Sequence, residues 1–175
     1  MGTDPNALDT LIAKEQIREL VLLYSRGVDR KDIELLRTLY TSDATDDHGP
    51  HFSGSADDYI AFLERSLPHM RYSGHHVCNH LISVNGAEAE GEVYAIAYHI
   101  IPDFKGGMVE DLACVRYVDR YRREEGRWLF AARVVEFDMR SVRSIPAPEG
   151  DAPDPNNDPS VTTLSSRLFA RGPRA

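Results

Sequence analysis

The sequence predicts an α+β fold, with helices in its first half and a mostly antiparallel sheet in its second half. Two observations support this prediction. Apolar residues recur with helical spacing up to about residue 70, and beyond residue 72 long apolar runs are separated by short turns that contain glycine. The chain has 175 residues, of which 42% are hydrophobic and 27% are charged. Such a chain fits one globular domain with its own core.

Three helices are expected in the first half. The first covers about residues 8–28, where its apolar positions form a single face. Asp32 is a plausible N-cap for a second helix over residues 33–40. The third is expected over residues 55–70, with Ser55 as its cap and Pro68 near its end.

Two hairpins are expected in the second half. The runs 75–84 and 88–101 flank "NGA", because Asn-Gly between two apolar runs is a strong hairpin signal. The runs 112–123 and 127–137 flank a turn that contains "EG". The unbroken stretch "VYAIAYHII" predicts a strand that is buried on both faces.

The composition changes after Arg143. Residues 144–160 contain five prolines and few apolar side chains. We therefore expect a domain over residues 1–143 and a Pro/Asp-rich tail over residues 144–175. The tail is expected to be partly mobile or lid-like. Its "LSSRLFA" segment can dock weakly over a pocket mouth, and a disordered tail is the alternative.

Charge and hydropathy exclude several classes of function. The net charge is −8, which argues against nucleic acid as the main partner because phosphate neutralisation needs a basic face. No apolar run approaches the ~20 residues that span a bilayer. The first residues do not have the pattern of a signal peptide, so a cytoplasmic location is expected. Cys78 and Cys114 provide neither a disulfide framework nor a zinc spacing.

Three segments carry a family resemblance. They are "IRELVLLYSRGVDRKDIELLRTLYTSDA", "SGHHVCNHLISVNGAEAEGEVYAIAYH" and "RYVDRYRREEGRWLFAARVVEF". Together they resemble the SnoaL-like branch of the nuclear transport factor 2-like superfamily, over about residues 8–140. This branch contains scytalone dehydratase, hexachlorocyclohexane dehydrochlorinase and bile-acid 7α-dehydratase. The resemblance implies a cone-shaped, barrel-like fold in which three N-terminal helices pack on a strongly curved sheet and enclose a pocket.

The resemblance also implies catalytic residues. In the lyases of this branch an Asp at the end of the first long helix pairs with a His that opens the first long strand, and Asp29 and His75 match them. His75 is preferred to His76 because it stands four residues before Asn79. Arg133 matches an Arg that follows a Trp by five residues. Tyr24 stands where the dehydrochlorinase has a Lys, which favours a dehydratase.

General chemistry gives these groups roles. A carboxylate that accepts a hydrogen bond from one imidazole nitrogen makes the other a better base, so Asp29 would activate His75. Tyr24 would donate to the oxygen that departs, and Arg133 would face an anion, either Asp29 or charge developing on a substrate. Substrate contacts are expected from His99, Tyr40 and Asn79.

Each assignment has a structural alternative. Asp29 can simply end a helix at the surface, and His75 and His76 can be polar residues that open a strand. Tyr24 can belong to the core, because an aromatic residue in a helical stripe usually does. His99 can be a core histidine of a buried strand whose hydrogen bonds are satisfied. Arg133 can pair with a structural carboxylate such as Asp119 or Glu136.

The expected function is that of a cofactor-independent lyase, most simply a dehydratase, or an isomerase that uses the same proton transfer. The expected substrate is an apolar cyclic small molecule of polyketide or steroid type, and no metal is expected. Two alternatives stay open: a non-catalytic binding protein of the same fold, and a small structural subunit of a ring-hydroxylating dioxygenase. We expect a homo-oligomer, trimer before dimer, because the strands offer more apolar surface than three helices can cover.

Overall fold

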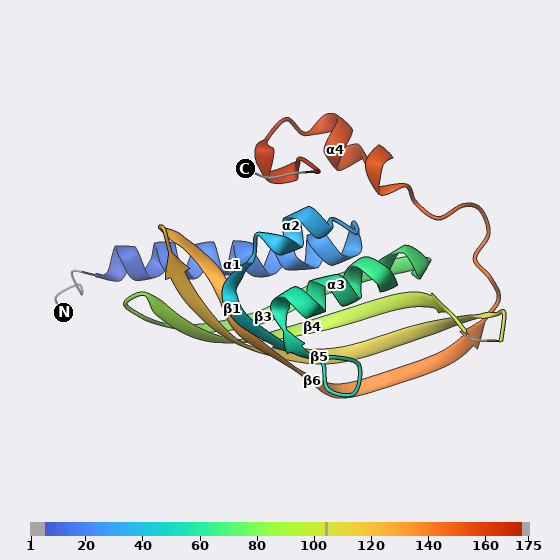
Figure 1. The fold of residues 1–175 in the computed structure, drawn as a ribbon, viewed down its shortest axis with the longest axis horizontal. Coiled ribbons are helices and arrows are strands. Elements are labelled where there is room, and N and C mark those ends of the chain that lie inside the picture. Colours follow the sequence, from blue (N-terminus) through green and yellow to red (C-terminus); the bar gives the residue numbers. More distant parts are fainter. Residues whose placement is uncertain (1–5, 104, 173–175) are drawn as a thin grey trace.

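A layer of helices covers one face of a curved sheet in the computed structural model, which describes residues 6–103 and 105–172 (Figure 1). The helices are α1 (Ala7–Asp29), α2 (Ile33–Arg37), α3 (Ala56–Ser66) and α4 (Pro159–Thr163), with 3₁₀ turns η1 (Leu67–His69), η2 (Pro155–Asn157) and η3 (Arg167–Phe169). The strands are β1 (Tyr40–Asp47), β2 (Ser53–Ser55), β3 (Tyr72–Asn85), β4 (Glu88–Pro102), β5 (Met108–Glu124) and β6 (Arg127–Ile145). Among the described residues, no helix is long and apolar enough to cross a membrane.

The sheet is open, and its strand order is β2-β1-β6-β5-β4-β3. Strands β3 to β6 pair antiparallel with one another in chain order. Strand β1 instead pairs in parallel with β6, with Tyr40 opposite Phe130 and Asp46 opposite Arg133. This one parallel pairing joins the helical first half of the chain to the last strand of the sheet.

The predicted helices and hairpins are confirmed in outline. Asp32 caps α2 by accepting the backbone N–H of Leu35 at 3.1 Å, and Ser55 caps α3 in the same way. The β5–β6 turn places Glu125 and Gly126 at φ 49° and 82°, the left-handed region that such a two-residue turn needs. Helix α2 ends at Arg37 rather than at residue 40.

Strands β1 and β2 were not predicted. Strand β1 has the sequence "YTSDATDD", which lacks a run of apolar residues. Its inward positions carry small or polar side chains, among them Ala44 and Asp46, both of which are buried. Because apolar alternation is the usual strand signal, this strand could be found only from its pairing with β6.

The prediction that β4 is buried on both faces is wrong for the single chain. Val93 and Ala95 are buried, whereas Tyr94 and Ile96 are 40% and 38% exposed on the opposite face. The strand therefore alternates in the usual way, with one face toward the helices. Its outer face is apolar and exposed.

The sheet bends where its pairing register shifts. Shifts occur between Val77 and His80 in β3 and at two places along β5, next to Cys114 and Arg120. Such bulges bend and twist a strand, so the sheet wraps around the helices and becomes concave. Buried residues of α1, including Ile17, Val21 and Tyr24, pack into this concave face.

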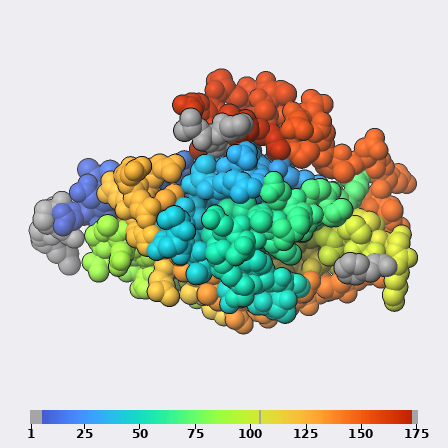
Figure 2. Space-filling view, viewed as in Figure 1, coloured from blue at the N-terminus to red at the C-terminus, as the bar shows by residue number. Residues whose placement is uncertain are grey.

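The described end of the C-terminal tail packs on the outer side of α1 and α2 (Figure 2). Arg26 donates to the hydroxyl of Ser160 and to the backbone oxygen of Phe169, both at 3.1 Å. Arg30 forms an ion pair with Asp158 at 2.9 Å. Strand β6 continues to Ile145, two residues beyond the domain boundary that the sequence predicts.

Candidate active site

A cavity of about 750 Å³ lies between the helices and the concave face of the sheet. Its walls are mostly apolar, with side chains such as Leu63, Leu67 and Phe137. Ala97 and Ala113 lie directly opposite each other on β4 and β5 and also line the cavity. Because both side chains are single methyl groups, they leave space between the sheet and the helices that larger residues would fill. The described part of the tail contributes no residue to this lining.

On the sheet side, the polar residues at the cavity come from two adjacent rows across the strands. One row runs from His75 on β3 to Arg140 on β6, with the two alanines between them. The next row contains Ser73, His99 and Asp111. Residues paired across neighbouring strands point to the same face of a sheet, and so does every second residue along one strand. The geometry of the sheet therefore places the side chains of both rows on the same face.

Asp29 and His75 meet as the sequence predicts. Asp29 is the last residue of α1, and its Oδ1 lies 2.6 Å from Nδ1 of His75. The same oxygen accepts the hydroxyl of Ser73 at 2.9 Å, and Oδ2 accepts the backbone N–H of His75 at 2.9 Å. An ionised carboxylate can only accept hydrogen bonds, so Nδ1 carries the proton and Nε2 is the basic nitrogen.

His75, not His76, belongs to the cavity. His75 lines it, and its side chain is 7% exposed. His76 is the next residue on the same strand and is exposed. Because side chains alternate between the two faces of a strand, only one of the two can face α1.

The surroundings of Asp29 keep it ionised. Burial acts to raise the pKa of this carboxyl, but the hydrogen bonds and charge of His75, with those of Ser73, outweigh it and leave the pKa below its usual value of 3.8. A carboxylate at the C-terminal end of a helix is unfavourable for the helix dipole. The position of Asp29 is therefore explained by its partners and not by the needs of the helix.

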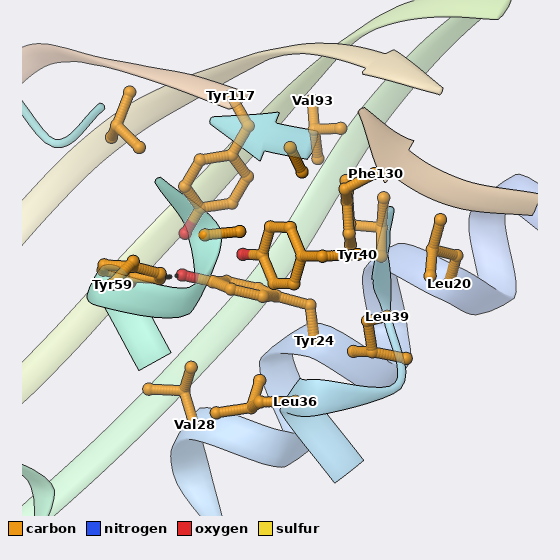
Figure 3. Close-up of a cluster of buried hydrophobic side chains, with 14 of the residues drawn as sticks. Leu20, Tyr24, Val28, Leu36, Leu39, Tyr40, Tyr59, Val93, Tyr117 and Phe130 are labelled. Atoms are coloured by element: carbon orange, nitrogen blue, oxygen red, sulfur yellow. Dashed lines mark hydrogen bonds between the residues drawn. The ribbon is translucent and has the colours of Figure 1, made fainter. Parts of the chain in front are cut away.

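Tyr24 lines the cavity with its hydroxyl 2.8 Å from the hydroxyl of Tyr59 (Figure 3). Burial raises the pKa of Tyr24 to about 12, with a further contribution from the charge of Asp46. Its ring stands edge-on to His75, with 6.4 Å between the ring centres. Tyr24 is both a core residue and a cavity residue, so the two readings of the sequence are not exclusive.

Arg133 pairs with Asp119, one of the two structural carboxylates considered from the sequence. Its Nε and Nη2 each donate to Asp119 at 2.8 Å, and both side chains are fully buried. The guanidinium carbon lies 4.2 Å from the ring centres of both Tyr24 and Tyr117 and 4.3 Å from that of Phe130. Arg133 is not a cavity-lining residue, so it acts on the site by holding these rings.

His99 lines the cavity beside His75, with 5.3 Å between the ring centres. Burial, assisted by the nearby His75, lowers the pKa of His99 to about 4. His99 is therefore neutral near pH 7 and can accept or donate a hydrogen bond without carrying charge.

Two residues expected to contact substrate lie elsewhere. Tyr40 is buried and donates its hydroxyl to Asp46 at 2.8 Å. Asn79 is exposed and lies in the stretch of β3 where the register shifts. Neither lines the cavity.

Three cavity histidines were not assigned a role from the sequence. His48 and His51 follow β1, and His69 ends η1. His48 and His51 lie in the loop between β1 and β2, and loops at the rim of a concave sheet close its pocket. The available signal was "DDHGPH", where two acidic residues and two histidines occur within six residues between two predicted elements. Nη1 of Arg140 donates to His51 at 2.8 Å, while its other nitrogens hold Asp111.

The fold and the cavity define a class of protein, the cone-shaped α+β proteins of the nuclear transport factor 2-like superfamily. Within that class, residues 9–134 match the SnoaL-like domain. The chain belongs to the SnoaL-like family. No curated protein sequence is significantly similar to it.

Solved structures share the fold. A protein from Novosphingobium aromaticivorans, provisionally named a scytalone dehydratase, is 25% identical with a TM-score of 0.68, and the match covers 82% of this chain and 97% of that one. A type 2 hexachlorocyclohexane dehydrochlorinase, LinA, is 17% identical with a TM-score of 0.70, covering 83% and 97%. The type 3 enzyme from Novosphingobium barchaimii is 18% identical with a TM-score of 0.65, covering 83% and 99%. These likenesses show that the chain shares the fold of these proteins.

Proposed function

We propose that this chain is a lyase of the dehydratase type, or an isomerase using the same proton transfer, that acts on an apolar cyclic small molecule. The observation that carries the proposal is the Asp29–His75 pair on the wall of an apolar cavity of about 750 Å³. Such a volume suits a drug-sized ring compound. The substrate is expected to be neutral, because Arg140, the cationic side chain of the lining, is already paired with Asp111.

In the proposed reaction His75 is the base. Its Nε2 removes a proton from a carbon next to a carbonyl or leaving group, and Asp29 stabilises the imidazolium that forms. Tyr24 donates a hydrogen bond to the oxygen that departs or gains charge. His99, neutral and adjacent, orients the substrate by a hydrogen bond. Arg133 keeps the ring of Tyr24 in place through its contact with the ring face.

A model reaction tests the base without knowledge of the substrate. In 5-nitro-1,2-benzisoxazole a base removes the carbon-bound proton, the N–O bond breaks, and a coloured cyanophenolate is released. We expect the protein to accelerate this elimination and His75→Gln to abolish the acceleration. The matched control is His76→Gln, which changes the exposed neighbour on the same strand and should have no effect.

The same preparation separates the alternatives. A molecule retained in the cavity, identified by mass spectrometry, names the substrate class. Tight binding of that molecule without any proton transfer would favour a binding protein. Stable co-purification with a large iron-containing protein would favour the dioxygenase subunit.

We also propose that the chain assembles as a homo-oligomer, trimer before dimer, through the outer face of the sheet. Val118 and Val134 pair across β5 and β6 and are 47% and 48% exposed, and Tyr94, Ile96 and Met139 extend this surface. Exposed apolar surface of this kind marks interfaces. Sedimentation should show a species larger than the 19.7 kDa chain. The double variant Val118→Glu/Val134→Glu should sediment as a monomer.

A further inference from the structure

A second carboxylate–imidazole pair faces the cavity from the opposite wall. Nδ1 of His48 lies 2.6 Å from Oδ1 of Asp46, at ion-pair distance though not in hydrogen-bond alignment. The side chain of Asp46 is fully buried, and its other oxygen accepts the hydroxyl of Tyr40 at 2.8 Å. The side chain of His48 is 17% exposed and lines the cavity. The function proposed above makes no use of this pair.

The pair is connected to Tyr24 through Tyr59. Nε2 of His48 lies 3.0 Å from the hydroxyl of Tyr59, and that hydroxyl lies 2.8 Å from the hydroxyl of Tyr24. The rings of His48 and Tyr59 are stacked, with 4.6 Å between their centres. Figure 3 shows the hydroxyls of Tyr24 and Tyr59 directed toward each other. The chain of contacts therefore draws on β1, the loop after it, α3 and α1.

This arrangement exceeds what packing requires. Buried polar networks are costly unless every member is satisfied, and apolar residues of similar size would serve a structural purpose as well. Tyr40 alone would satisfy one oxygen of Asp46 without any histidine. The chain instead places a titratable ring and two phenols in line, ending beside His75.

We propose that Asp46, His48 and Tyr59 form a proton relay that supplies Tyr24 with the proton it gives to the leaving group. This inference rests on the proposed lyase or isomerase function. His75 is the base on one wall of the cavity, and the relay is the source of acid on the other. Asp46 is a positioning residue that holds the ring of His48 beside Tyr59.

The two protonation states of His48 reverse the direction of the hydrogen bonds. When His48 carries a proton on Nδ1 alone, Tyr24 donates to Tyr59 and Tyr59 donates to Nε2. When Nε2 is also protonated, His48 donates to Tyr59 and Tyr59 donates to Tyr24. Only the second state frees the proton of Tyr24 for a substrate.

The proton transfers balance in an elimination of water. His75 takes the carbon-bound proton, the electrons of that bond form the double bond, and the C–O bond breaks with its electron pair on oxygen. Tyr24 protonates the leaving oxygen to give water, Tyr59 reprotonates Tyr24, and His48 reprotonates Tyr59. The cycle closes when His75 releases a proton to solvent and His48 takes one up. Burial raises the pKa of Tyr24 to about 12, so replacement of its proton is needed after each transfer.

Several titratable or charged groups surround His48. On its own strand and loop they are Asp46, Tyr40 and His51, and from the helices they are Tyr24 and Tyr59. Arg140 on β6 contacts His51, and Arg133 on β6 acts on Tyr24. Burial, and after it the charge of Arg140, lowers the pKa of His51. A pH-dependent signal in this region must therefore be assigned to His48 with the help of variants, and not from its midpoint alone.

The first test needs no substrate. Tyrosine labelled with ¹³C at Cζ and histidine labelled with ¹⁵N allow both ends of the relay to be followed by nuclear magnetic resonance. We expect the Cζ signal of Tyr24 to shift with the same midpoint as the ring of His48. In Tyr59→Phe the His48 titration should persist while the Tyr24 shift disappears. The relay would be overturned if the Tyr24 signal does not shift with the His48 titration in the wild type. It would also be overturned if the Tyr24 signal shifts with that titration to the same extent in Tyr59→Phe.

The matched control is Tyr98→Phe. Tyr98 also places its hydroxyl on a carboxylate, Glu110 at 2.6 Å, but it is outside the cavity lining. This variant should leave the coupling between His48 and Tyr24 unchanged. Loss of the coupling in Tyr98→Phe would mean that the signal reports general loosening and not a relay.

The second test uses benzisoxazoles whose leaving phenols differ in acidity. Without the relay, the elimination of the compound with the poorer leaving group should slow most. Tyr59→Phe should therefore lower the rate for 1,2-benzisoxazole by about tenfold or more beyond its effect on the rate for the 5-nitro compound. An equal effect on both compounds would overturn the relay while leaving His75 as the base. Loss of elimination in wild type would overturn the proposed function instead, and the magnetic resonance result would still decide whether the relay exists.

Discussion

The carboxylate of Asp29 binds both the side chain and the backbone of a single residue, His75. Oδ1 lies 2.6 Å from Nδ1 and Oδ2 accepts the backbone N–H at 2.9 Å. Two contacts to one residue fix the ring more firmly than a side-chain contact alone, because the backbone of β3 cannot rotate away. The end of α1 is thereby fastened to the start of the long hairpin.

Asp29→Asn should lower the model elimination by roughly 10²-fold, because the amide cannot stabilise the imidazolium. Shape and volume are kept, so the fold should survive. The ¹⁵N spectrum of His75 provides a direct readout: the Nδ1-protonated tautomer should no longer dominate. A spectrum identical to that of the wild type would show that Asp29 does not control the ring. Asp57→Asn, on the first turn of α3, is a suitable control.

The stability contributed by Asp29 should depend on pH. The pKa of this carboxyl is below its usual value of 3.8, since the hydrogen bonds from His75 and Ser73 outweigh the effect of burial. A group with a lowered folded pKa contributes stability above its unfolded pKa and loses it as pH falls through the folded value. The difference in unfolding free energy between wild type and Asp29→Asn should therefore shift against the wild type from about pH 5 downward. Urea titrations at several pH values would measure it, and a pH-independent difference would contradict the prediction.

Arg133→Met should destabilise the fold by about 3–5 kcal/mol, because it leaves Asp119 charged and unpaired in the core. The double variant Arg133→Met/Asp119→Leu should recover most of this loss. The control is the exposed pair of Arg116 and Asp138, for which Arg116→Met should change the stability little because solvent screens exposed charges. Denaturant unfolding of the three variants and the wild type gives the comparison. Equal losses in the buried and exposed pairs would contradict it.

Gly27→Ala should destabilise α1, although alanine is the better helix former. A Cβ at this position would lie 2.6 Å from Cδ2 and 2.8 Å from Cγ of Leu36, which is fully buried. Overpacking costs about 1–3 kcal/mol, more than the ~0.5–1 kcal/mol gained from helix propensity. Leu36→Val shortens the obstructing side chain, so Gly27→Ala should lower the free energy of unfolding by less in the Leu36→Val background. If the effects of the two substitutions on the free energy of unfolding are additive, Leu36 is not the obstacle.

The sequence predicted the elements whose signals are local. The face of α1 follows from helical spacing, and the hairpins follow from "NGA" and "EEG", because turn chemistry acts over a few residues. Asp29 and His75 were identified by the family resemblance, and their contact became visible only in three dimensions. Asn79 was expected at the site because it completes a His-x-x-x-Asn pattern that the family resemblance suggests. It lies outside the lining because the shift in β3 changes which residues face inward.

The sequence did not reveal the part of the site around Asp46 and His48, because its position depends on pairing between distant segments of the chain. Strand β1 carries Asp46 and leads to His48, and it is held in place by β6, more than 80 residues later in the chain. No local pattern encodes such a pairing. His48 therefore read as a loop residue, although the loop closes the cavity opposite His75.

The parallel pairing of β1 with β6 also has a consequence during synthesis. Tyr40 cannot find Phe130, nor Asp46 its place beside Arg133, until the ribosome has released nearly the whole domain. Until then β1 is an unpaired edge, and the apolar side of α3 has no finished sheet to cover. Contacts so distant in sequence form slowly and leave nascent chains prone to aggregation. The wall that carries His48 should thus be the last part of the pocket to form. A chain on a ribosome stalled before β6 would have the segment that carries His75 but not yet the wall that carries His48.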